Sequence, residues 1–138
     1  MKMSPNGLKT LSLREGTRHN AYKDTKGIWT IGVGHTGPEV LPDLIWSDKE
    51  VFDQLKRDVA KTEDCINSLV KVPLTQNQFD ALSSFIFNVG VGAFIRSTML
   101  KKINARDFVG ATAEFDKWHI PPEITSRRNS EKLQFAGA

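Results

Sequence analysis

The sequence has a single cysteine, Cys65, and no apolar run long enough to cross a membrane. One cysteine cannot form an internal disulfide, so the fold does not depend on an oxidising compartment. We interpret Cys65 as a small core residue of a helix and assign it no chemistry. The N-terminus, MKMSPNGLKTLSLREG, lacks the apolar core of a signal peptide or membrane anchor. We therefore expect a protein that is made and soluble in the cytoplasm and does not insert stably into a membrane.

The sequence also lacks a concentrated cluster of charge. The net charge is +3 with a pI of about 9.1, so nucleic acid, anionic lipid and an anionic wall polymer all fit as partners. Arg127-Arg128 is the only adjacent arginine pair, and aromatic residues do not alternate with basic ones as in a single-strand binding groove. We predict a solvated basic surface and no nucleic-acid partner. No residues have metal-ligand spacing, so we expect neither a metal nor another cofactor.

The first predicted helix ends beside a carboxylate. The chain of 138 residues, 39% hydrophobic and 25% charged, is long enough to bury the core of one domain. Ser4-Pro5 is typical of a helix start, and Gly16 is typical of a residue just past a helix end. Glu15 then stands at the C-terminal end of the helix, where the helix dipole disfavours a negative charge. That position favours a protonated carboxyl group.

Turn and strand signals follow. Asp24 and Gly27 have the spacing of a turn, and the β-branched and aromatic residues 28–31 predict a strand. We expect this strand to continue to His35, so that Gly32 and Gly34 alternate along it and clear one face for a backbone or ligand. The segment predicts a small antiparallel sheet.

The rest of the chain predicts helices. Ser47 with Glu50, and Thr75 with Gln78, have the spacing of capping boxes. The first opens a helix to about residue 70, and further helices are predicted over residues 76–89, 97–103, 107–118 and 123–135. The fold class is α+β, with one domain over residues 1–138. It comprises a small N-terminal antiparallel sheet lobe (about 16–46), a long connecting helix (about 47–70) and a larger helical lobe (about 71–138, with the N-terminal helix).

Glu15 and Asp24 suit acid–base chemistry on a glycosidic bond, which needs one protonated and one ionised carboxyl group. Glu15 fits the proton donor and Asp24, in a polar turn, fits the base. Thr30 could hold a water with Asp24, which is the inverting arrangement and needs roughly 6.5–9.5 Å between the carboxyl groups. Spacing alone leaves a structural interpretation open, in which Asp24 caps its own turn and Thr30 is an ordinary strand residue.

The segment from Glu15 to Thr36 resembles the N-terminal signature of the phage-type lysozymes (endolysins), glycoside hydrolase family 24, which include the T-even and lambdoid phage enzymes. Their catalytic pattern is Glu, eight residues, Asp or Cys, five residues, Thr, and Glu15, Asp24 and Thr30 match it in identity and spacing. The resemblance continues through LTQNQFDAL, FNVG and STML, and resumes near the end of the chain at Trp118 and Arg127-Arg128. It covers nearly the whole chain.

The resemblance implies a lysozyme-like fold and hydrolysis of the β-1,4 bond between N-acetylmuramic acid and N-acetylglucosamine in peptidoglycan. Glu15 would be the general acid, and Asp24 with Thr30 would position the attacking water. The substrate-binding residues by position are Thr36, Phe87 and Ser97, although Phe87 equally fits a core residue. Supporting roles fall to His35, expected to hydrogen-bond near Glu15, and to Arg127 or Arg128, one of which would pack against Glu15.

The family also implies how such a protein acts in its host. We expect a monomer that stays in the host cytoplasm until a separate holin opens the membrane, and that then reaches the cell wall from the periplasm. One departure from the family is the segment from His119 to Thr125, a shorter and stiffer connection where relatives carry a glycine-rich loop. Alternatives are a non-catalytic wall-binding protein, a lysozyme module of a toxin or phage tail, and a nucleic-acid-binding protein. We interpret His19 and His119 as surface or loop residues.

Overall fold

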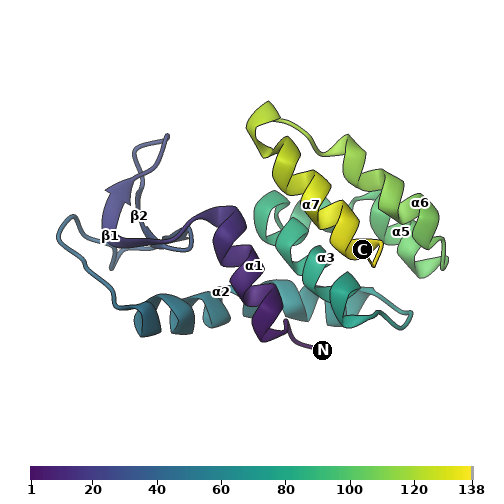
Figure 1. The fold of residues 1–138 in the computed structure, drawn as a ribbon, viewed down its shortest axis with the longest axis horizontal. Coiled ribbons are helices and arrows are strands. Elements are labelled where there is room, and N and C mark those ends of the chain that lie inside the picture. The colour runs from purple at the N-terminus through teal and green to yellow at the C-terminus, as the bar shows by residue number, and fades with distance from the viewer. Residues whose placement is uncertain (138) are drawn as a thin grey trace. The chain divides into compact units, whose positions relative to one another are not determined.

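A computed structural model describes residues 1–137 of the chain, which forms two compact units. One unit comprises residues 8–60, and the other comprises residues 1–7 together with the chain from residue 61 onward. Two helices, α1 (Pro5–Glu15) and α2 (Asp48–Leu69), contribute residues to both. The predicted α+β class, with a small antiparallel sheet and a long helix, is confirmed (Figure 1). The predicted lobe boundaries stay a prediction.

The unit of residues 8–60 holds a three-stranded antiparallel sheet with strand order β1-β2-β3. The strands are β1 (Arg18–Lys23), β2 (Trp29–Gly32) and β3 (His35–Thr36), and Figure 1 shows β1 and β2 as a hairpin. The unit buries eight apolar side chains: Leu8, Leu11, Ile31, Val33, Val40, Val51, Leu55 and Val59.

The prediction of a single strand through to His35 is wrong. The chain turns at Val33 and Gly34, and Gly32 and Gly34 both have φ of +67°, in the left-handed region that favours glycine. The two glycines therefore let β2 fold back onto β3 as a hairpin, and they do not alternate along one strand. The expected close approach does occur at Gly32, where an added Cβ would lie 3.2 Å from the Trp46 ring.

The ends of α1 follow the sequence signals. The Ser4 hydroxyl accepts a hydrogen bond from the Gly7 N–H at 2.9 Å, which caps the N-terminus. Gly16 has φ of +79°, and its N–H donates to the Ser12 carbonyl at 2.9 Å. The prediction that the helix ends at Glu15 is confirmed.

The other unit is helical. It contains α3 (Gln76–Val89), α4 (Val91–Ile95), α5 (Thr98–Asn104), α6 (Phe108–Glu114) and α7 (Thr125–Phe135), with 3-10 turns η1 (Phe115–Lys117) and η2 (Pro122–Ile124). Figure 1 shows α3 and α7 side by side, and α5 packs on α6, which also contacts α7. The aromatic core comprises Phe79, Phe85, Phe94, Phe115 and Phe135, all fully or almost fully buried.

Both predicted capping boxes are present. The N–H of Ser47 donates to the Glu50 carboxylate at 3.1 Å, and the Glu50 N–H donates back to the Ser47 hydroxyl at 3.2 Å. Thr75 and Gln78 form the same reciprocal pair at the start of α3.

Three helix details differ from the prediction. The short helix α4 follows Gly90 and was not predicted, and α6 ends at Glu114 because the chain tightens there into a 3-10 turn. The last helix begins at Thr125, two residues later than predicted, because Pro122 starts a 3-10 turn. Within residues 1–137, no helix has the length and apolar character needed to cross a membrane.

Candidate active site

Glu15 lies against the hairpin turn of the sheet. It is the last residue of α1 and is half-buried. A Cβ added to Gly34 would lie 3.8 Å from Glu15 Oε2, so the carboxyl group contacts the turn between β2 and β3. The absence of a side chain at Gly34 leaves one side of that carboxyl group uncovered by this turn.

Asp24 both caps its own turn and presents a carboxylate. Its Oδ1 accepts hydrogen bonds from the backbone N–H groups of Lys26 at 2.8 Å and Ile28 at 2.9 Å. The backbone closes the same turn, since the Gly27 N–H donates to the Asp24 carbonyl at 3.0 Å. Within the described chain, nothing donates to Oδ2. The structural interpretation of Asp24 is therefore correct for one oxygen, and the other remains able to accept a proton from water.

The peptide group of Ile28 links Asp24 to Thr30. The Ile28 carbonyl accepts the Asp24 N–H at 2.9 Å and the Thr30 hydroxyl at 3.0 Å. Thr30 is 4% exposed and its hydroxyl donates to this carbonyl, while the hydroxyl oxygen can still accept a hydrogen bond from a water. The structure thus brings Asp24 and Thr30 together around one backbone carbonyl.

His35 fixes the hairpin turn through two carboxylates. Its Nδ1 lies 2.8 Å from Asp58 Oδ2, and its Nε2 lies 2.6 Å from Glu39 Oε1. Burial of the ring lowers the pKa of His35, but the hydrogen bonds to Glu39 and Asp58 outweigh burial and raise it above its ordinary value. A neutral ring carries one N–H and can donate to only one of the two carboxylates, whereas the imidazolium donates to both. The Trp46 ring packs 5.5 Å from that of His35.

Sequence reasoning missed both partners of His35. Glu39 lies four residues after His35, a spacing that predicts a side-chain contact on a helix but not in a loop. Asp58 lies 23 residues away on α2. A solvent-facing helix carboxylate gives no local signal of such a contact. Only the packing of α2 on the sheet unit brings Asp58 to the ring.

The three predicted substrate-binding residues divide between the two units. Thr36 is exposed on β3 and pairs directly with Thr30 on β2. Phe87, half-buried on α3, and Ser97 belong to the helical unit. The Ser97 hydroxyl caps α5, since it accepts from the Leu100 N–H at 3.2 Å and donates to the Phe94 carbonyl at 2.7 Å. Contact of these residues with substrate stays a prediction.

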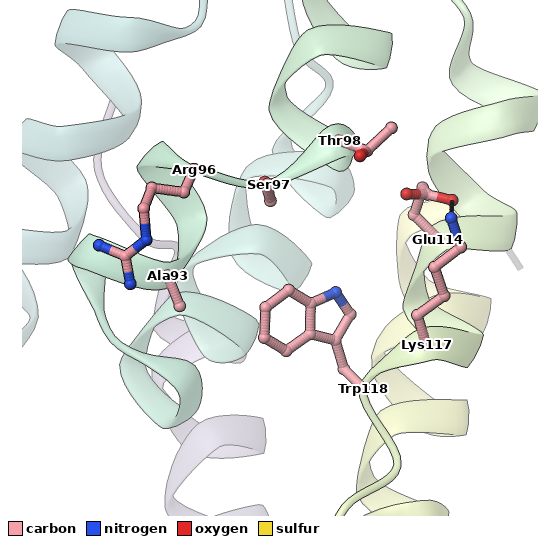
Figure 2. A pocket seen from close by; sticks show the side chains of 7 residues that line it. All are labelled: Ala93, Arg96, Ser97, Thr98, Glu114, Lys117 and Trp118. Atoms are coloured by element: carbon pink, nitrogen blue, oxygen red, sulfur yellow. Dashed lines mark ion pairs between the residues drawn. The ribbon is translucent and has the colours of Figure 1, made fainter.

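Ser97 opens onto a pocket of about 460 Å³ in the helical unit (Figure 2). In Figure 2 the Trp118 ring points into the pocket, with Glu114 and Lys117 on one side and Arg96 on the other. The Glu114 carboxylate lies 2.7 Å from Lys117 Nζ and 3.3 Å from that of Lys102. The Lys117 hydrogen bond, aided by Lys102, outweighs burial and lowers the pKa of Glu114 below its ordinary value. The pocket combines an indole surface with a positively charged rim.

The arginine pair belongs to a buried network. Arg128 is fully buried and donates to Glu131, to Asn88 and, at 3.0 Å, to the Trp118 carbonyl. Its guanidinium carbon lies 4.8 Å from the centre of the Phe85 ring. Arg127 Nε donates to the other Glu131 oxygen at 3.1 Å. The predicted contact of one arginine with Glu15 stays a prediction.

The remaining titratable residues considered from the sequence are His19, His119 and Cys65, and none of them lies in a cluster of catalytic side chains. His19 is half-exposed, with Nε2 3.2 Å from Asp48 and Nδ1 3.1 Å from the Trp46 carbonyl. His119 lies in a loop and is half-buried. Burial raises the pKa of the Cys65 thiol. Over residues 1–137, no group of three or more His, Cys, Asp or Glu side chains could hold a metal ion.

Comparison with known proteins gives consistent matches over almost the whole chain. A family model described as phage lysozyme matches residues 12–131. An endolysin of Acyrthosiphon pisum secondary endosymbiont phage 1 is 42% identical over the full length of both chains. A mutant of P22 lysozyme has 40% identity, coverage of 99% of each chain and a TM-score of 0.92. The muramidase domain of SpmX from Asticaccaulis excentricus has 35% identity, coverage of 97% of each chain and a TM-score of 0.88.

Proposed function

The chain belongs to the phage lysozyme family, and from that premise we propose that Glu15, Asp24 and Thr30 hydrolyse the wall glycan with inversion. The protein is a glycoside hydrolase, a muramidase that acts on peptidoglycan. The bond that it cleaves is the β-1,4 link between N-acetylmuramic acid and N-acetylglucosamine. The observation that carries the proposal is the backbone of Ile28, whose N–H donates to the Asp24 carboxylate and whose carbonyl accepts from the Asp24 N–H and the Thr30 hydroxyl.

Glu15 is the proposed general acid. Hydrolysis requires a proton on the leaving oxygen, and of the three proposed residues Glu15 is the carboxyl group left to supply it once Asp24 acts as the base. The half-buried position of Glu15 beside Gly34, which has no side chain, supports the same role. The acid loses its proton to the leaving sugar as the bond breaks.

Asp24 is the proposed base, and Thr30 helps to hold its water. Two backbone N–H groups on Oδ1 fix the orientation of the carboxylate. Oδ2 then takes a proton from a water that also donates to the Thr30 oxygen. That water attacks the anomeric carbon from the face opposite the leaving group, which inverts the configuration.

Glu15→Gln and Asp24→Asn test these roles on purified peptidoglycan. We expect each to reduce the release of reducing sugars by more than about a hundredfold, the range of general acid–base catalysis, with little change in thermal stability. Glu50→Gln, at an exposed helix cap, is the matched control and should keep full activity. Activity retained in Glu15→Gln removes that residue from the acid role.

The stereochemistry tests the attacking water separately. Proton NMR of the first-formed product distinguishes the two anomers before they equilibrate. Inversion of a β bond gives the α anomer first. A β anomer would refute the direct attack by water and require a covalent intermediate instead.

We further propose that the protein is a monomer that waits in the host cytoplasm and lyses the cell once a separate holin opens the membrane. Its relatives named endolysin and the absence of a spanning helix in residues 1–137 support this order of events. Expression alone should leave host cells intact, and a membrane-permeabilising agent should then trigger lysis. Lysis without permeabilisation would contradict the need for a holin.

A further inference from the structure

The turn that borders Glu15 is held on both sides by contacts with one indole ring. A Cβ added to Gly32 would lie 3.2 Å from the Trp46 ring, and the ring of His35 packs 5.5 Å from the same indole. The turn between these two contacts contains Gly34, and a Cβ added there would lie 3.8 Å from Glu15 Oε2. The position of this turn therefore determines where the Glu15 carboxyl group has room.

Two acidic side chains from separate elements hold the His35 ring. Asp58 Oδ2, on α2, lies 2.8 Å from Nδ1, and Glu39 Oε1, in the loop after β3, lies 2.6 Å from Nε2. The Asp58 carboxylate is fixed to its own helix, because its other oxygen accepts from the Gln54 amide at 2.8 Å. The side chain of His35 is 14% exposed, whereas that of Glu39 is 55% exposed. Glu39 is therefore the outer partner, and it determines whether the ring is held at both nitrogens.

The loop after β3 leaves room for the Glu39 carboxylate beside its own backbone. A Cβ added to Gly37 would lie 2.5 Å from Glu39 Oε2, so the carboxylate fills the place where a side chain at that position would begin. The hydrogen bond from His35 lowers the pKa of Glu39 below its ordinary value, so the carboxylate is ionised at neutral pH. The absence of a side chain at Gly37 thus lets an exposed acid reach the ring.

We infer that Glu39 is a positioning residue for the reaction: by holding His35, it fixes the turn on which the Glu15 carboxyl group lies. This rests on the proposed role of Glu15 as the general acid. A proton donor must lie within about 3 Å of the leaving oxygen, and a displacement of about 1 Å costs up to about a hundredfold in rate. Glu39 acts through the ring and the turn, so its effect falls on kcat and not on the binding of the glycan.

Steady-state kinetics on soluble glycan fragments of peptidoglycan test the inference. Glu39→Ala removes the contact, and we expect kcat to fall about 5–10-fold with KM within about twofold. The loss stays below a hundredfold because Asp58 still holds the other ring nitrogen. Glu39→Gln keeps an acceptor on a side chain of the same length and should keep kcat within about twofold of wild type. Circular dichroism and the urea midpoint verify that each variant is folded at the assay temperature.

Asp48→Asn is the matched control. Asp48 also pairs with a histidine of the same unit, since its Oδ1 lies 3.2 Å from His19 Nε2, and its side chain is 96% exposed. His19 lies on β1, whereas the turn beside Glu15 joins β2 to β3. The variant removes the same charge from a similar pair and should leave both kcat and KM unchanged.

Three kinetic results would overturn the inference. An unchanged kcat in Glu39→Ala would show that the contact does not position the acid. A rise in KM with kcat unchanged would place Glu39 in contact with the glycan instead. Equal losses of kcat in Glu39→Ala and Glu39→Gln, or a comparable loss in Asp48→Asn, would attribute the effect to charge and not to the contact with His35.

Carbon-13 NMR of the Glu15 carboxyl group separates this inference from the proposed function. Its resonance is assigned by its disappearance in Glu15→Gln. It should shift in Glu39→Ala and stay in place in Glu39→Gln and Asp48→Asn. If Glu15→Gln retains activity, the proposed function fails, and a shifted resonance in Glu39→Ala still supports the positioning of Glu15. An unshifted resonance overturns the inference whatever the activity of Glu15→Gln.

Discussion

Replacing Arg128 with methionine tests how the helical unit is held together. The guanidinium of Arg128 donates to Glu131, to Asn88 and to the Trp118 carbonyl, all inside the unit. Methionine keeps much of the aliphatic volume and removes every donor. The variant therefore leaves three acceptors short of a donor, one of them a fully buried carboxylate.

The magnitude follows from burial. Removing one partner of a buried ion pair costs about 3–5 kcal/mol, because the other charge stays buried without compensation. Arg127 and the Ser84 hydroxyl, at 3.1 and 2.5 Å from Glu131 Oε2, still stabilise that carboxylate and keep the loss within this range. Against a total of about 5–15 kcal/mol, the loss is a large fraction. The melting temperature should fall by about 10–20 °C.

Urea unfolding followed by far-UV circular dichroism measures the loss of unfolding free energy. The dependence of that free energy on urea concentration should be the same in the variant and the wild type. Lys49→Met is the control, because its 2.7 Å pair with Asp53 is exposed and should leave the midpoint unchanged. In Arg128→Met/Glu131→Leu both buried charges are gone, so part of the stability should return. A loss below about 1 kcal/mol in Arg128→Met, or a double variant no better than it, would refute the argument.

Three further predictions concern the sheet unit and the caps. Because the pKa of His35 is raised, its stabilisation is complete below pH of about 6.5 and is lost as pH rises through the folded value. The melting temperature, measured as a function of pH, should fall over that range, and Asp58→Asn should make the fall smaller. An equal fall in the variant would contradict a stabilising contact of His35 with Asp58. Thr75→Ala should lower the free energy of unfolding, measured in urea, by about 1 kcal/mol. An unchanged urea midpoint would show that this cap does not stabilise the fold. Gly27→Ala should cost about 1 kcal/mol for its φ of +78° alone, and Gly32→Ala about 2 kcal/mol or more, since its Cβ would also meet an indole at 3.2 Å. Equal losses in the two glycine variants would contradict the packing argument.

Features governed by short-range hydrogen bonds were predictable. The capping boxes at Ser47 and Thr75 and the helix end at Glu15 each depend on groups within four residues of one another. The turn at Asp24 is of the same kind, since its carboxylate bonds backbone groups two and four residues ahead. The spacing of Glu15, Asp24 and Thr30 also identified the family, because their positions in the chain are themselves the motif.

Contacts between distant residues were not predictable. The sequence favoured one strand through Gly32 and Gly34, whereas the structure forms a hairpin in which Ile31 pairs with His35. Alternation and turn formation use the same glycines, and only cross-strand hydrogen bonds distinguish them. The cation–π contact of the Arg18 guanidinium with the Tyr22 ring likewise depends on which face of the sheet Tyr22 occupies.

The sequence by itself determined the two capping boxes, the helix end at Glu15, the turn that orients Asp24 and the family motif, because each depends on residues close together in the chain. Only the tertiary structure decided that His35 is held by Asp58 and Glu39, and that Arg128 is fully buried against Glu131. A charged side chain looks the same in sequence whether it is solvated or buried. Its environment is set by the packing of elements far apart in the chain, where hydrogen-bonding partners must offset the desolvation of the charge.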